Sequence, residues 1–147
     1  MNQNENSSGP AINDTDIEYS VSNDGEKFAI PQEQDYVEEF KRIEKLANQA
    51  REENKEIVVV MGMGFVGIVM AAIVADTVDS DGQPSKFVIG CQRPSIRSFW
   101  KISLMNRGQS PLKAEDPEVK EIIERTVLER KHLLPRSITT ASSWLTV

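Results

Sequence analysis

The spacing of apolar and polar positions along the chain predicts a long surface helix followed by strands and helices in turn. From Gln32 to about Glu53, apolar side chains recur at intervals of three and four among charged and amide side chains, as in an amphipathic helix. Ile57–Met61 is an uninterrupted apolar run, typical of a parallel strand covered on both faces. The stretch from Phe65 to about Thr77 is apolar on nearly every side, which predicts a buried helix.

The same alternation of patterns continues beyond a polar turn at residues 79–84. Phe87–Cys91 is predicted to be a second strand, residues 96–106 and 118–131 two further helices, and Ile138–Thr140 the start of a third strand. The order strand–helix–strand–helix–helix–strand predicts an α/β fold, the first half of a Rossmann-like doubly wound parallel sheet.

Three regions follow from these patterns. Residues 1–30 are rich in acidic and small polar side chains and are predicted to be a disordered acidic tail. Residues 31–55 contain the amphipathic helix, and residues 56–147 form a partial dinucleotide-binding (Rossmann) domain. The apolar stripe of the helix either packs on that domain, the commoner use of such a stripe, or binds a partner protein.

Charge and cysteine content narrow the classes of function. The net charge is −6; residues 1–55 carry 13 acidic and 6 basic side chains, whereas residues 56–147 carry 10 and 11. A basic face for nucleic acid is therefore not expected. The single cysteine excludes an internal disulfide and fits a reducing cytoplasm. The first 30 residues have no apolar segment typical of a signal peptide, and glycines interrupt the longest apolar stretch, so we expect no membrane span.

The first predicted strand meets the next helix at a glycine-rich turn, Gly62-Met63-Gly64-Phe65-Val66-Gly67. In a Gly-x-Gly-x-x-Gly turn the first glycine permits the tight bend, and the second lets the backbone approach a pyrophosphate. The third lets the helix pack close to the strand. The sequence therefore predicts a dinucleotide whose pyrophosphate lies at the N-terminus of the helix.

Two motifs resemble the nucleotide-sugar dehydrogenases, the UDP-glucose/GDP-mannose dehydrogenase family. The glycine turn ends in Phe65-Val66-Gly67, similar to that family's aromatic-Val-Gly ending. Asn106-Arg107-Gly108-Gln109-Ser110-Pro111 resembles the family's Asn-x-Gly-x-x-Pro segment. Residues 1–55 have no counterpart in the family.

The resemblance implies a cytoplasmic NAD-dependent oxidoreductase that oxidises the sugar C6 alcohol of a UDP- or GDP-sugar to a uronate for polysaccharide biosynthesis. It implies two hydride transfers through a covalent intermediate on a cysteine, and a homodimer formed through a central helix and a C-terminal domain. It also implies the residues that hold the cofactor: Gly62, Met63, Gly64, Phe65, Val66 and Gly67 at the pyrophosphate, with Gln92, Arg93 and Arg97 beside the adenosine ribose.

Gln92 departs from the pattern, because NAD-binding domains usually place Asp or Glu at the end of this strand. An amide does not repel a 2′-phosphate as a carboxylate does, and Arg93 and Arg97 are close in sequence. We therefore hypothesise relaxed discrimination between NAD and NADP. The alternative is that both arginines only form a solvated start to the next helix.

No catalytic residue and no metal ligand is assigned. The family's catalytic cysteine lies far downstream of this region, and Cys91 is interpreted as a small buried residue. His132, the only histidine, is interpreted as a cation at the end of a helix. The chain is thus expected to be a fragment that binds NAD but is inactive alone. The alternative is a non-catalytic module that binds a dinucleotide or a protein partner.

Overall fold

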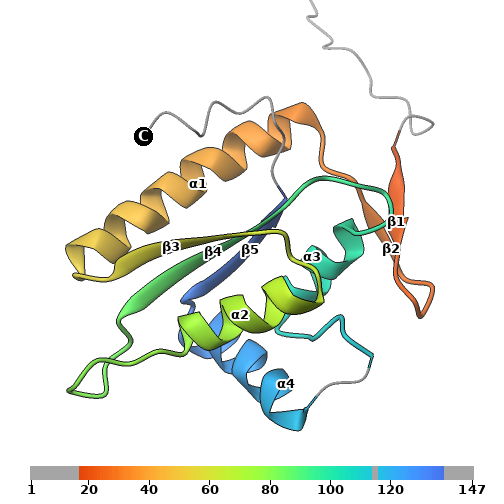
Figure 1. Cartoon of the computed structure of the whole chain (residues 1–147). Coiled ribbons are helices and arrows are strands. Elements are labelled where there is room, and N and C mark those ends of the chain that lie inside the picture. The colour runs from red at the N-terminus through yellow and green to blue at the C-terminus, as the bar shows by residue number, and fades with distance from the viewer. Residues whose placement is uncertain (1–16, 114–115, 138–147) are drawn as a thin grey trace, which may run out of the picture.

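A three-stranded parallel sheet forms the centre of the computed structural model, which describes residues 17–113 and 116–137. Its strands β3 (Glu56–Met61), β4 (Lys86–Gln92) and β5 (Leu133–Ser137) lie in the order β3-β4-β5 (Figure 1). Helices flank the sheet, so the predicted mixed α/β architecture with parallel strands is confirmed.

Helices cover both faces of this sheet. Helix α1 (Glu33–Glu52) lies on one face, and α2 (Phe65–Ala75), α3 (Phe99–Asn106) and α4 (Pro117–Glu124) lie on the other (Figure 1). The apolar stripe of α1 buries Ile43 and Ala50 against strand residues that include Phe87 and Ile89. The stripe therefore packs on the domain, which is the first of the two interpretations drawn from the sequence.

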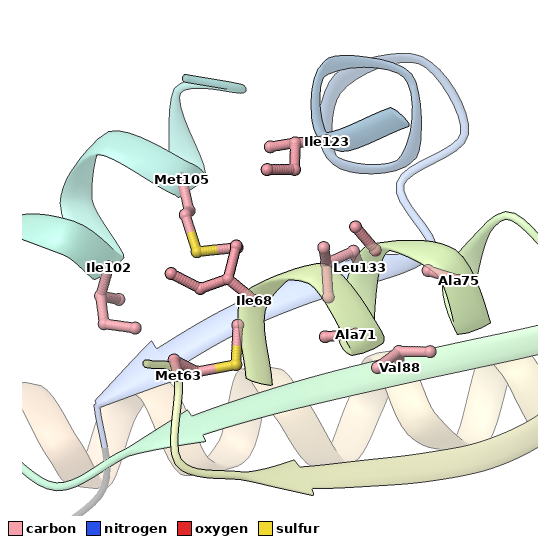
Figure 2. Packing of buried hydrophobic residues seen from close by; sticks show 10 residues of the cluster. Met63, Ile68, Ala71, Ala75, Val88, Ile102, Met105, Ile123 and Leu133 are labelled. Atoms are coloured by element: carbon pink, nitrogen blue, oxygen red, sulfur yellow. The ribbon is translucent and has the colours of Figure 1, made fainter. Parts of the chain in front are cut away.

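The larger core lies between the sheet and α2, α3 and α4 (Figure 2). Ile68 and Ala71 of α2 are fully buried there, together with Val88 of β4. Val88 faces this core while its neighbours Phe87 and Ile89 face α1, as expected for a strand buried on both faces. The alternation explains why β4 is apolar at nearly every position.

The predicted disordered tail is wrong over residues 17–30. Strands β1 (Tyr19–Val21) and β2 (Lys27–Ala29) form an antiparallel hairpin against α3, and Ser20 is fully buried. The Ser20 hydroxyl donates a hydrogen bond to the carbonyl of Ile96 (2.6 Å) and accepts one from the N–H of Trp100 (3.0 Å). A polar side chain thus anchors the hairpin, so no apolar pattern predicted it. Residues 1–16 lie outside the described residues.

The last predicted helix and strand also differ in position. Helix α4 continues into η1 (Arg125–Glu129), a single turn of π-helix, and β5 begins at Leu133, before the predicted third strand. The sequence did not predict this strand because Pro135 and Arg136 interrupt its apolar pattern. Arg136 is buried, pairs with Glu39 of α1, and donates to the side chain of Asn106 in α3 (3.0 Å). Residues 138–147 lie outside the described residues.

Helix α2 is buried on one side only, which contradicts the prediction that it is buried all round. Ile68, Ala71, Ala72 and Ala75 are at most 1% exposed. Phe65, Val66, Met70 and Ile73, on the opposite side, are 48–68% exposed. Within residues 17–113 and 116–137, only Leu112, Asp116 and Val119 line a pocket with Phe65, Val66 and Met70, and this second side stays about half exposed. No helix among the described residues is long and apolar enough to cross a membrane.

Candidate functional site

The glycine turn joins the carboxyl end of β3 to the N-terminus of α2, and its first and third glycines are required by its geometry. Gly62 has a φ of +89°, which other residues rarely adopt, and its N–H donates to the carbonyl of Cys91 (2.8 Å). A Cβ added at Gly67 would lie 1.8 Å from the carbonyl oxygen of Gly62. Helix α2 can begin this close to β3 only because position 67 has no side chain.

Gly64 differs, because nothing within the described structure requires a glycine there. Its backbone is extended (φ −81°, ψ −166°), and a Cβ added to it has no atom within 4 Å. It faces solvent at the start of α2, where no described side chain caps the helix. The first N–H groups of a helix have no intrahelical acceptor and carry partial positive charge. This end of α2 therefore offers exposed donors suited to a phosphate.

Met63 holds the turn in place but does not face the candidate site. Its side chain is 1% exposed and packs against Gly90, where an added Cβ would lie 2.6 Å from the Met63 sulfur. Its N–H donates to Oε1 of Gln92 (2.7 Å). Met63 was assigned to the pyrophosphate, but its side chain lies on the buried side of the turn and supports the turn by packing. The importance of Gly90 was missed, since no spacing in the sequence marks it.

The structure brings Gln92 to the turn through this hydrogen bond. The bond fixes the Oε1 atom toward Met63 and leaves the amide N–H₂ group as a donor. Arg93 and Arg97 follow on the exposed segment before α3. In the part of the chain that the structure describes, neither guanidinium takes part in a hydrogen bond or an ion pair. Both remain available to an anion.

The electrostatic character of the site also suits an anion. The sequence has no charged side chain between Glu56 and Asp76, and the only charges between Lys86 and Lys101 are Arg93 and Arg97. No carboxylate on either segment therefore competes with a phosphate for the N-terminus of α2. Phe65 and Val66 are 64% and 68% exposed, which leaves the mouth of the turn open.

Cys91 and His132 have structural surroundings. Burial raises the pKa of the Cys91 thiol, which disfavours the nucleophilic thiolate. His132 is buried just before β5, and burial together with Lys55 and Arg130 lowers its pKa. The interpretation of His132 as a cation at a helix end is therefore wrong, because its surroundings favour the neutral ring. The described residues contain no group of three or more side chains able to hold a metal ion.

The second motif, Asn106 to Pro111, is used in packing. The Asn106 side chain accepts a hydrogen bond from Arg136 (3.0 Å), and Arg107 pairs with Glu26 of the hairpin loop. Gly108 has a φ of +71° and an added Cβ would overlap Leu128. This segment therefore fastens α3 to its neighbours and lies outside the glycine turn.

Comparisons of the chain with protein-family models, with curated proteins and with solved structures found no match.

Proposed function

We propose that this chain is the NAD-binding portion of a nucleotide-sugar 6-dehydrogenase, and that its sheet is the first half of a Rossmann-like doubly wound domain. The observation that carries the proposal is the glycine turn. Gly62 and Gly67 are required for its shape, whereas Gly64 is surrounded by empty space at an uncapped helix N-terminus. A glycine at a position where the fold does not require one is explained by a ligand that approaches the backbone closely.

The strand order supports the fold part of the proposal. In the doubly wound fold, the first three strands lie side by side in chain order, and the ligand binds outside their carboxyl ends. Strands β3, β4 and β5 have this order, and both the turn and Gln92 lie at their carboxyl ends. The pyrophosphate would bind the N–H groups that begin α2, and the adenosine ribose would lie near Gln92.

The proposed chemistry of this chain is limited to holding the cofactor. Hydride transfer needs a substrate positioned against the nicotinamide, and the family's reaction needs a cysteine nucleophile. Cys91 is the only cysteine, and it is buried with a raised pKa. We therefore expect the chain alone to bind the dinucleotide without oxidising a UDP- or GDP-sugar.

Calorimetric titration with NAD and with NADP tests the proposal. Wild-type chain is expected to bind both, and Gly64→Ala is expected to weaken binding at least about tenfold while the fold is kept, because the added methyl group enters space left for the phosphates. Lys45→Ala, an exposed change on α1, is the matched control and is expected to bind as the wild type does. Absence of dinucleotide binding by folded wild-type chain would exclude the proposal.

A non-catalytic module that binds a protein partner remains the second candidate function. The packing of α1 on the sheet removes the helix that was expected to serve such a partner. The exposed side of α2 provides another apolar surface, and it is the observation that favours this candidate.

A further inference from the structure

Two exposed arginines follow the carboxyl end of β4, beside the proposed dinucleotide site. Gln92, the last residue of β4, is tied to the glycine turn by the hydrogen bond from the N–H of Met63 to its Oε1 atom (2.7 Å). Arg93 comes directly after it and Arg97 four residues later, and both are exposed. We call residues 93–98 the arginine segment, and it connects the turn with the start of α3.

The backbone of the arginine segment is fixed by hydrogen bonds from the core. The Ser20 hydroxyl donates to the carbonyl of Ile96 (2.6 Å), and the indole N–H of Trp100 donates to the carbonyl of Arg97 (3.0 Å). Both donor side chains belong to buried residues. The N–H of Arg97 in turn donates to Oγ of Ser95 (3.1 Å). Because the backbone is already ordered, only side-chain freedom is lost when the guanidinium groups bind a ligand.

The charges of these two arginines are not used in the described structure. Within residues 17–113 and 116–137 neither guanidinium forms a hydrogen bond or an ion pair, whereas Arg107, Arg125 and Arg136 each pair with a carboxylate. A cation before a helix also opposes the partial positive charge of the helix N-terminus. Arg97 lies two residues before Phe99, where α3 begins, and the first turn of α3 has no acidic residue. A bound anion would offset these unfavourable charges.

The polar groups that Gln92 and the two arginines offer to a ligand are hydrogen-bond donors. The Oε1 atom of Gln92 already accepts from Met63, which leaves its N–H₂ group to donate. A guanidinium has five N–H donors and no acceptor. NAD-binding domains usually hold the ribose 2′-hydroxyl with the carboxylate of Asp or Glu. No carboxylate occurs between Lys86 and Lys101, so this edge suits a group that accepts hydrogen bonds.

We propose that Arg93, Arg97 and the amide of Gln92 form a subsite for the 2′-phosphate of the dinucleotide, so that the site favours NADP over NAD. The inference rests on the proposed function, because the glycine turn must hold the pyrophosphate. A phosphate monoester presents acceptor oxygens and a charge of about −1.5 to −2 at pH 7. The planar fork of arginine binds two such oxygens at once. The resemblance implies NAD, and this subsite is a departure from it.

Calorimetric titration of the full 147-residue chain tests the inference with two pairs of ligands. NADP is expected to bind at least about tenfold more tightly than NAD, and adenosine 2′,5′-bisphosphate at least about tenfold more tightly than adenosine 5′-phosphate. Since the second pair lacks the nicotinamide half, it measures the effect of the 2′-phosphate alone. Added salt is expected to reduce both preferences, because it screens exposed charges.

Removal of one guanidinium at a time measures the part of each arginine. Arg93→Gln and Arg97→Gln are each expected to weaken NADP binding at least about fivefold and to leave NAD binding within about twofold of wild type. Both side chains are exposed, so the variants are expected to fold, which circular dichroism checks. The matched control is Arg51→Gln, an exposed change on α1, and it is expected to bind both dinucleotides as the wild type does.

The outcomes separate this inference from the proposed function. Folded wild-type chain that binds neither dinucleotide would overturn both. Wild-type chain that binds NAD as tightly as NADP, or more tightly, would overturn the subsite and leave the proposed function standing. A preference for NADP that persists unchanged in both Arg93→Gln and Arg97→Gln would also overturn the subsite, because the 2′-phosphate would then be held elsewhere.

Discussion

Replacing Gly67 with alanine is expected to destabilise this protein, although the same change stabilises most helices. Gly67 lies in the first turn of α2, and alanine is favoured over glycine in helices by up to about 1 kcal/mol. Against this gain stands the overlap at the turn, where the added Cβ would lie 1.8 Å from the oxygen and 2.9 Å from the carbon of the Gly62 carbonyl. The sign of the change depends on which effect is larger.

The overlap is expected to dominate, because the Gly62 carbonyl is backbone and is held on both sides. Gly62 has a φ of +89°, and its N–H is bonded to the carbonyl of Cys91. Separation of the atoms to a normal contact needs a shift of more than about 1 Å between α2 and β3. Overpacking costs typically 1–3 kcal/mol and at times more. We take the upper value, so the net loss is about 2 kcal/mol, or roughly 30-fold in the unfolding equilibrium constant.

Urea unfolding of Gly67→Ala and Gly64→Ala, followed by circular dichroism, measures this difference. With the usual urea dependence of 1–3 kcal/mol per molar, the midpoint of Gly67→Ala is expected to fall by about 1 M. Gly64→Ala is the control, because its Cβ meets no atom within 4 Å, and its midpoint is expected to stay the same or rise slightly. A Gly67→Ala protein as stable as wild type would refute the close approach of α2 to β3.

Three further changes test other parts of the structure. If Gln92 faces the ribose, Gln92→Glu is expected to raise the preference for NAD over NADP at least about tenfold in calorimetric titrations, and an unchanged ratio would contradict that role. Asp76→Asn weakens two hydrogen bonds from Arg125 (2.9 and 2.7 Å) and is expected to cost about 1–3 kcal/mol in urea unfolding. Because the hydrogen bond from Arg125 lowers the pKa of Asp76, the stability from this carboxylate is complete above about pH 4 and is lost as the pH falls through the folded-state pKa. In Asp76→Asn, this loss of stability at low pH should be absent. Ser20→Ala removes the buried hydroxyl that accepts from Trp100 and is expected to cost about 1–2 kcal/mol, so a loss under about 0.5 kcal/mol would argue against the hairpin as a stabilising element.

The elements that the sequence predicted well are those whose pattern repeats over many residues. Helix α1 and strands β3 and β4 lie within a few residues of their predicted bounds, because their apolar positions follow one period throughout. Strand β5 did not follow such a pattern. Its Arg136 is accommodated by Glu39 and Asn106, on helices distant in sequence, and burial lowers its pKa to about 10. Local propensity carries no information about those partners.

The candidate site likewise has one part that the sequence could predict and one part that it could not. The turn could be predicted because three glycines at fixed spacing satisfy constraints within one short segment, and two of them are required by that geometry. The link from Gln92 to the N–H of Met63 could not be predicted, since it depends on the pairing register of β3 with β4. The hairpin was missed because its strands have three residues each and its buried anchor, Ser20, is polar.

Helix α2 shows what an apolar pattern determines and what it leaves open. Its composition predicted burial on all sides, and the described residues cover one side. The apolar pattern shows how much apolar surface the helix has, but it does not show which residues cover that surface. The proposed dinucleotide site uses the N-terminus of α2, and Met70 and Ile73 lie farther along its exposed side. Gly64→Ala should therefore weaken dinucleotide binding, while Ile73→Glu should leave it unchanged. A loss of dinucleotide binding in folded Ile73→Glu would contradict this and would mean that the exposed side of α2 is coupled to the turn.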